Sequence, residues 1–201
     1  YTTSHKMPLQ RIDEVAPGVK LGLWRITEQA EELPRPTTAD VSAYHGGRLK
    51  EKLVTYALLH AMTGNNDGII GHDSSGKPLL ANMHISLSHT KGWAALILSP
   101  YQEVAVDIEY RSNRVCRVAD RFMRDDEEKG GVDIQLTCWS AKETTFKFFS
   151  ADHLLFQDMR MAPFTPSDHG VLTMENLRRK IHLTVHYELN ADYVLTWATS
   201  L

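Results

Sequence analysis

Residues 181–189 read IHLTVHYEL and carry the clearest strand pattern of the chain. Apolar and polar residues alternate along this stretch, as they do in a strand with one buried and one solvated face. Asn190-Ala191-Asp192 follows with turn-forming residues, and residues 193–199 supply a second apolar run. These residues predict an antiparallel hairpin, and an antiparallel sheet is therefore the starting point for the fold.

Upstream of the hairpin, strand-like and helical patterns are mixed. Runs typical of strands cover residues 84–88, 93–99 and 103–109, which predict a three-stranded meander. Apolar residues follow helical spacing over residues 48–64 and again over about 136–149. The regular alternation of strand and helix that builds parallel sheets is missing. The sequence therefore predicts an α+β fold with largely antiparallel sheet.

The composition is that of a soluble globular protein. Of 201 residues, 42% are apolar and 23% are charged, and the formal net charge is -3. These values exclude a disordered or fibrous chain. Because nucleic-acid binding needs clustered Lys and Arg, the lack of a basic excess argues against nucleic acid as a partner.

The sequence also predicts no membrane anchor and a cytoplasmic location. The longest apolar stretches, residues 93–98 and 193–197, are far shorter than the roughly 20 residues that span a bilayer. Residues 1–6 lack the apolar core of a signal peptide. Cys116 and Cys138 form no CxxC pair, which favours a reducing compartment. We expect Cys138 to be a buried, inert thiol.

Two carboxylates end an otherwise apolar strand. Residues 104–109 read VAVDIE, and on a strand Asp107 and Glu109 point to the same face. Such a pair is half of a site for a hard divalent cation such as Mg²⁺. The alternative is a strand that emerges into solvent, and the pair alone does not decide between the two.

The second helix carries a carboxylate and a lysine on the same face. It reads WSAKETTFK over residues 139–147, which places Glu143 and Lys147 about one turn apart. A solvent-exposed ion pair has the same spacing. Trp139 and Phe146 are predicted to form the apolar stripe that fixes this helix against a sheet. The role of Glu143 and Lys147 therefore depends on what they face.

Two short polar stretches lie further upstream. Gly76-Lys77-Pro78 is a loop, and Ser88-His89-Thr90 leaves a strand for a turn, where hydroxyl, imidazole and backbone N–H groups can receive a phosphate. A histidine at a strand end is more often a solvated or capping residue, so this motif is weak alone. The histidines show no zinc-binding spacing.

In this order, GKP, SLSHT, VDIE and WSAKETTFK resemble the 4'-phosphopantetheinyl transferases of the surfactin-synthetase-activating type. That family has a hydrophobic-Gly/Ala-hydrophobic-Asp-x-Glu strand and a Trp-Ser-x-Lys-Glu-Ala/Ser-x-x-Lys helix. Ala105 stands where Gly is usual, and Thr144 replaces a small Ala or Ser. Near Tyr56 the family often has a basic residue. Its candidate substitutes are Arg48, Lys50 and Lys52.

The resemblance implies transfer of the 4'-phosphopantetheine arm of coenzyme A to a serine of an acyl or peptidyl carrier protein, with release of adenosine 3',5'-bisphosphate. Asp107, Glu109 and Glu143 are then expected to bind Mg²⁺, and the catalytic residues are expected to be Asp107, Glu143 as the base, and Lys147 at the departing bisphosphate. The residues expected to hold the cofactor are Lys77, Ser88, His89, Lys142 and Lys147.

Carrier proteins are acidic, and one helical face of this chain is basic. Four arginines share that face: Arg114, Arg117, Arg121 and Arg124. They either steer the carrier protein toward the metal site or form a solvated face balanced by the acidic run at residues 125–128. Because one chain supplies both sets of motifs, we expect a monomer.

The cofactor motifs begin in the first half and the metal motifs lie in the second. We therefore expect a coenzyme A phosphate-binding half over residues 1–100 and a metal-binding, catalytic half over residues 101–201. These would be two similar α/β halves related by a pseudo-two-fold axis, each a small sheet packed with a long helix, with the active site at their interface. Two rivals are a metal-dependent phosphohydrolase and a catalytically silent family member that binds coenzyme A or the carrier protein.

Overall fold

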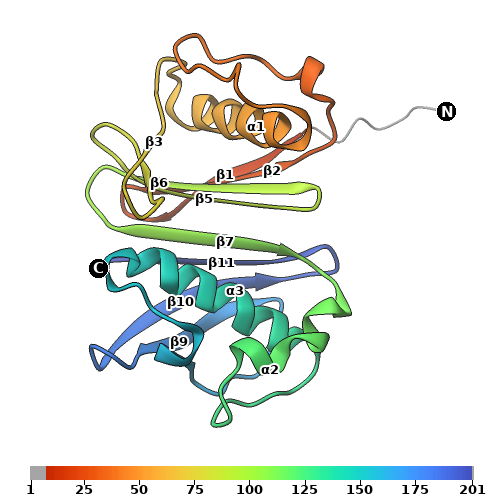
Figure 1. The fold of residues 1–201 in the computed structure, drawn as a ribbon, viewed down its shortest axis with the longest axis vertical. Coiled ribbons are helices and arrows are strands. Elements are labelled where there is room, and N and C mark those ends of the chain that lie inside the picture. Colours follow the sequence, from red (N-terminus) through yellow and green to blue (C-terminus); the bar gives the residue numbers. More distant parts are fainter. Residues whose placement is uncertain (1–7, 201) are drawn as a thin grey trace, which may run out of the picture.

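The described residues form two larger antiparallel sheets, each packed with one long helix, and a short two-stranded sheet of β3 and β4 (Figure 1). This computed structural model describes residues 8–200, so the signal-peptide expectation for residues 1–6 lies outside the described residues. The strands are β1 (Leu9–Ala16), β2 (Val19–Arg25), β3 (Gly71–His72), β4 (Pro78–Leu79), β5 (His84–Thr90), β6 (Trp93–Ser99), β7 (Val104–Tyr110), β8 (Met159–Met161), β9 (His169–Asn176), β10 (Ile181–Leu189) and β11 (Tyr193–Thr199). The helices are α1 (Gly46–Thr63), α2 (Ala119–Phe122) and α3 (Val132–Phe148). The predicted α+β class with antiparallel sheets is confirmed.

The first sheet has the strand order β1-β2-β6-β5, and α1 packs on it. Gly22 on β2 permits the close approach of α1, because a Cβ atom there would lie 2.6 Å from Met62 Sδ and 2.8 Å from Leu58 Cδ1. The helix ends at Gly64, whose φ of 70° is left-handed and whose N–H donates to the His60 carbonyl oxygen. The helix end predicted at Gly64 is confirmed.

The second sheet has the order β7-β11-β10-β9-β8, with α3 against it. The predicted hairpin is confirmed as β10 and β11. Small side chains face the sheet from α3, and the fully buried ones include Cys138, Ser140, Ala141, Thr144 and Thr145. The predicted stripe of Trp139 and Phe146 is therefore wrong. Phe146 is 41% exposed, and Trp139 packs against Phe122 and Phe156 instead.

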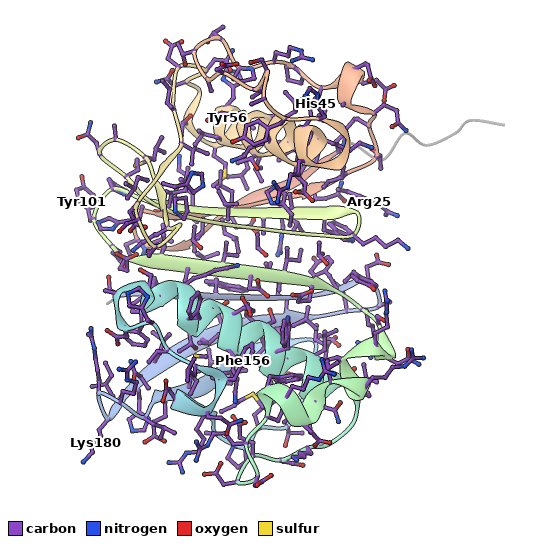
Figure 2. All side chains as sticks on the ribbon, viewed as in Figure 1. Arg25, His45, Tyr56, Tyr101, Phe156 and Lys180 are labelled. Atoms are coloured by element: carbon purple, nitrogen blue, oxygen red, sulfur yellow. The ribbon has the colours of Figure 1, made fainter. Side chains whose placement is uncertain are left out.

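The predicted meander is only partly confirmed, because β7 leaves the first sheet. β5 and β6 form a hairpin, but β7 pairs with β11 in the second sheet. The chain crosses over near Tyr101, which protrudes from the turn between β6 and β7 and is 84% exposed (Figure 2). β5 and β7, one edge strand from each sheet, lie side by side (Figure 1). A division into domains at residue 100, and a pseudo-two-fold axis, stay predictions.

A buried apolar cluster joins the two sheets beside this seam. It combines residues of both: Val19, Leu21, Leu23, Trp93, Ala95, Ile97, Val104, Val106, Ile108, Tyr193, Leu195 and Trp197. Cys138 is buried as predicted, and burial raises the pKa of its thiol to about 12. Within residues 8–200, no helix is long and apolar enough to cross a membrane.

Candidate active site

Asp107 lies in the seam between the two sheets and is 3% exposed. Its Oδ1 accepts hydrogen bonds from Ser88 Oγ at 3.0 Å and from Lys147 Nζ at 2.9 Å. Its Oδ2 accepts a hydrogen bond from Ser140 Oγ at 2.9 Å. The donors come from β5 of the first sheet and from α3 on the second. Both halves of the chain therefore fix this carboxylate.

Glu109 and Glu143 lie near Asp107 in partly buried positions. Burial raises the pKa of Glu109 to about 7, and the charge of Asp107 adds to that rise. Trp139 Nε1 donates to Glu109 Oε1 at 2.8 Å. Burial also raises the pKa of Glu143, the charge of Asp107 adds to this, and Lys147 opposes it. The three carboxylates thus repel one another.

The carboxylates do not form a finished metal site. Among the described residues, no group of three His, Cys, Asp or Glu side chains converges to hold a metal ion. Glu143 lines a cavity on one side of α3, Glu109 lines a separate groove, and Asp107 is buried. The donor chemistry nevertheless fits Mg²⁺, because carboxylate oxygens are hard ligands. Burial and the charge of Asp107 raise the pKa of both Glu109 and Glu143, and a cation would offset both effects.

A cavity of about 270 Å³ lies next to this cluster. Lys77, Glu143 and Lys147 all line it, so the structure brings together three predicted site residues from the loop before β4 and from α3. Lys77 Nζ lies 2.5 Å from Glu103 Oε1. Ser150 and His153, which sequence reasoning did not single out, line the same cavity. We call it the lysine cavity.

A second cavity, of about 300 Å³, adjoins the first at Leu87, which lines both. We call it the histidine cavity, because His89 lines it and accepts or donates a 2.8 Å hydrogen bond with Thr55 Oγ1. Burial lowers the pKa of His89 to about 4, and the charges of Lys147 and Lys52 lower it further. His89 is therefore neutral at pH 7.

Two of the three candidate basic residues near Tyr56 line the histidine cavity. Tyr56 lies on α1 above the first sheet (Figure 2), and Arg48 and Lys52 line the cavity with it. The Lys52 ammonium also lies 5.2 Å from the ring centre of Tyr44. Lys50 points elsewhere and donates to Gln29 Oε1. Arg48 and Lys52, but not Lys50, are therefore placed beside His89.

The expectation that Lys142 contacts the cofactor is wrong. Lys142 is fully buried, and its Nζ donates to Glu127 Oε2 at 2.8 Å and to the Phe122 carbonyl oxygen at 2.7 Å. Positions 142 and 147 are five residues apart on α3, which turns them about 140° from each other. Lys147 faces Asp107, whereas Lys142 ties the 122–127 segment to the helix.

Ser88 differs from the expectation that it contacts the cofactor. It is 8% exposed, and its hydroxyl donates to Asp107 and accepts the Ile108 N–H. Thr144, which stands where the family has Ala or Ser, is accommodated because its Oγ1 lies 2.7 Å from Thr196 Oγ1 in the α3–β11 interface. Ser140, to which the sequence analysis gave no role, supports Asp107. Its place directly after Trp139 in the helix motif was the available signal.

The basic face is shorter than predicted. Residues 113–122 form a 3-10 turn and the four-residue α2 rather than one helix. Arg114 and Arg117 line a groove of about 420 Å³ together with Glu109. Arg124 does not join them, because its guanidinium binds Asp126 and the Gln157 carbonyl oxygen. Arg114, Arg117 and Arg121 are exposed.

Comparison with known proteins finds a similarity over part of the chain. Residues 103–198, just under half of the chain, match the family model of the 4'-phosphopantetheinyl transferase superfamily. The matched segment contains Asp107, Glu109, Glu143 and Lys147, and it excludes Lys77 and the 88–89 pair. No curated protein sequence matches the chain significantly.

Proposed function

We propose that the chain transfers the 4'-phosphopantetheine group of coenzyme A to a serine of an apo acyl or peptidyl carrier protein and releases adenosine 3',5'-bisphosphate. The observation that carries this proposal is the shared placement of Lys77, Glu143 and Lys147 on one cavity beside Asp107. Coenzyme A carries a pyrophosphate and a 3'-phosphate, and this cavity offers two ammonium groups next to a carboxylate. The superfamily match over residues 103–198 supports the same reaction class.

Asp107, Glu109 and Glu143 would hold the Mg²⁺ that this chemistry requires. When bound, the ion neutralises charge on the pyrophosphate and stabilises the negative charge that develops during transfer. A bound cation would offset the burial and the repulsion from Asp107 that raise the pKa values of Glu109 and Glu143.

Glu143 is the proposed general base for the carrier serine. Burial raises its pKa, which makes it a better proton acceptor than an ordinary carboxylate while it remains ionised at higher pH. It also lines an apolar cavity of about 250 Å³ with Phe146 and Leu155, so an incoming chain can approach it from a side other than that of the lysine cavity. Acceptor and cofactor would thus meet at this carboxylate.

The phosphates of coenzyme A would extend over both cavities. Lys147 and Lys77 are proposed to hold the pyrophosphate, with Lys147 stabilising charge on the departing bisphosphate. Arg48, Lys52 and His89 are proposed to receive the 3'-phosphate in the histidine cavity. Since His89 is neutral, its contribution would be a hydrogen bond, and the charge would come from α1. Arg48 and Lys52 then take the place of the basic residue usual near Tyr56.

The partners follow from this reaction. We propose that the acidic carrier protein approaches the groove lined by Glu109, Arg114 and Arg117, because that groove brings exposed positive charge next to the site. The protein is proposed to act as a cytoplasmic monomer, with no nucleic acid involved.

The test is to incubate the protein with coenzyme A, Mg²⁺ and several apo carrier proteins, and to weigh each carrier by intact-mass spectrometry. The proposal predicts a mass gain of one phosphopantetheinyl group on the carrier and equal release of the bisphosphate. Release of a phosphate product from coenzyme A without carrier modification would instead identify a phosphohydrolase. Tight binding of coenzyme A without any turnover would identify a catalytically silent member.

A further inference from the structure

Three hydroxyl groups on β5 hold the facing edge of β7. Ser86 Oγ accepts the Val106 N–H at 3.1 Å, Ser88 Oγ accepts the Ile108 N–H at 3.2 Å, and Thr90 Oγ1 accepts the Tyr110 N–H at 3.1 Å. We call these contacts the hydroxyl ladder. The donors and the acceptors both recur at every second residue, because alternate residues of a strand point the same way.

The ladder explains how two sheet edges lie together without a backbone pairing. β7 is the edge strand of the second sheet, and its other edge pairs with β11. The N–H groups on its open edge are buried and need acceptors. Side-chain hydroxyls from β5 supply them, and Lys147 Nζ donates to the Val106 carbonyl oxygen on the same edge. The strand that carries Asp107 is thereby fixed to the first sheet.

Ser88 differs from the other two hydroxyl groups of the ladder because it also contacts Asp107. Besides accepting the Ile108 N–H, it donates its only proton to Asp107 Oδ1 at 3.0 Å. A hydroxyl has one donor, so this proton is not free for a phosphate oxygen. The side chain is also 8% exposed. Both facts disagree with the expectation that Ser88 contacts the cofactor.

We propose that Ser88 is a positioning residue, which fixes the orientation of the Asp107 carboxylate, and that it is not a ligand of the coenzyme A phosphates. Asp107 Oδ1 accepts hydrogen bonds from Ser88 on the first sheet and from Lys147 on α3, and its Oδ2 accepts one from Ser140 on α3. Ser88 is thus the contact that fixes this carboxylate relative to the first sheet. The carboxylate therefore presents a defined direction to the reaction centre before any substrate arrives. The catalytic part of this inference rests on the proposed transferase function.

The test compares Ser88→Ala with the matched control Thr90→Val, which also removes one hydroxyl and one N–H contact from the ladder. For Ser88→Ala we expect kcat to fall by about 10- to 100-fold, as misplaced catalytic groups do, with an unchanged KM for coenzyme A. Thr90→Val should leave both values unchanged, because Thr90 does not contact Asp107. An increase in KM at constant kcat, or no change in either value, would overturn the proposal.

Two measurements are independent of transferase activity. Amide exchange should accelerate at Ile108 in Ser88→Ala and at Tyr110 in Thr90→Val, and protection kept at the other core amides shows that each variant folds. A crystal structure of Ser88→Ala should show a rotated or doubly placed Asp107 carboxylate. If wild-type protein modifies no carrier, the proposed function fails, but the Asp107 orientation still decides this inference: an unchanged carboxylate contradicts it.

Discussion

Lys147 Nζ lies 2.9 Å from Asp107 Oδ1 and 2.9 Å from the Val106 carbonyl oxygen. A lysine on α3 is therefore bound both to the buried carboxylate of β7 and to the backbone of that strand. This contact supplies positive charge at the centre of three mutually repelling carboxylates. It also places the ammonium on the wall of the lysine cavity, 28% exposed at the side chain, where a phosphate can reach it.

Lys147→Met should reduce kcat for carrier modification by roughly 10²-fold or more, because the developing charge on the bisphosphate loses its ammonium partner. Lys147→Arg keeps the charge but replaces a compact ammonium with a planar fork, so it should recover only part of the rate. Steady-state assays of the three proteins check this. Equal rates for wild type and Lys147→Met would show that Lys147 has no role in the reaction.

Glu109→Gln should stabilise the protein, and more so at high pH. The folded-state pKa of Glu109, about 7, lies above the ordinary value of 4.5, so the folded protein binds more protons between these values. Stability therefore falls as pH rises from 4.5 to 7, and the amide lacks this penalty. We expect a gain on the order of 1 to 2 kcal/mol at pH 8 and almost none at pH 4.5.

Thermal unfolding of wild type and Glu109→Gln at both pH values measures that difference. Gln retains an oxygen that can accept the Trp139 Nε1 hydrogen bond, so packing is kept. The same substitution should lower the transfer rate, because it removes a proposed metal ligand. A melting temperature that rises equally at pH 4.5 and pH 8 would show that charge is not the cause.

Lys142→Met should destabilise the fold by about 3 to 5 kcal/mol, because it leaves Glu127 as a buried, unpaired charge. Urea unfolding measures this loss. Under conditions where the variant is folded, KM for coenzyme A should equal that of wild type, since Lys142 does not face either cavity. A stable variant with a raised KM for coenzyme A would instead indicate that Lys142 contacts the cofactor.

Reversing two exposed charges, Arg117→Glu with Arg121→Glu, should raise KM for the carrier protein at low salt and leave KM for coenzyme A unchanged. The control reverses Lys20 and Arg35, which are exposed in the first half and change the net charge equally. Rates measured at low and high ionic strength distinguish lost electrostatic attraction of the carrier protein, which salt screens, from a disturbed structure, which salt does not affect. An unchanged rate at low salt would end the steering hypothesis.

Local pattern was enough to predict the hairpin β10–β11 and the helices α1 and α3, but not the strand β1. Its apolar residues Leu9, Ile12 and Val15 are spaced by three, so no alternation is visible. Arg11 on this strand forms an ion pair at 2.6 Å with Glu188 on β10, a long-range contact that local pattern does not reveal. β7 was assigned to the wrong sheet for the same reason, since its pairing with β11 is a long-range contact.

The motifs predicted which residue types gather at the site, and the structure decides what each one faces. Lys147 contacts Asp107, and the charge of Asp107 adds to the rise in the pKa of Glu143. That Lys142 faces away from Lys147 could be predicted from the sequence, because helical geometry turns the two side chains apart. The pairing of Ser88 with Asp107 could not be predicted, because it depends on how the edges of two sheets meet.

The most direct measurement is the rate at which wild type and Glu143→Gln modify an apo carrier protein in the presence of coenzyme A and Mg²⁺, followed by intact mass. The proposed function predicts a phosphopantetheinylated carrier with wild type, none with wild type when EDTA is added, and a rate at least about 10²-fold lower with Glu143→Gln, which still binds coenzyme A. Equal modification rates for wild type and Glu143→Gln, or no modification of the carrier by either protein, would contradict it.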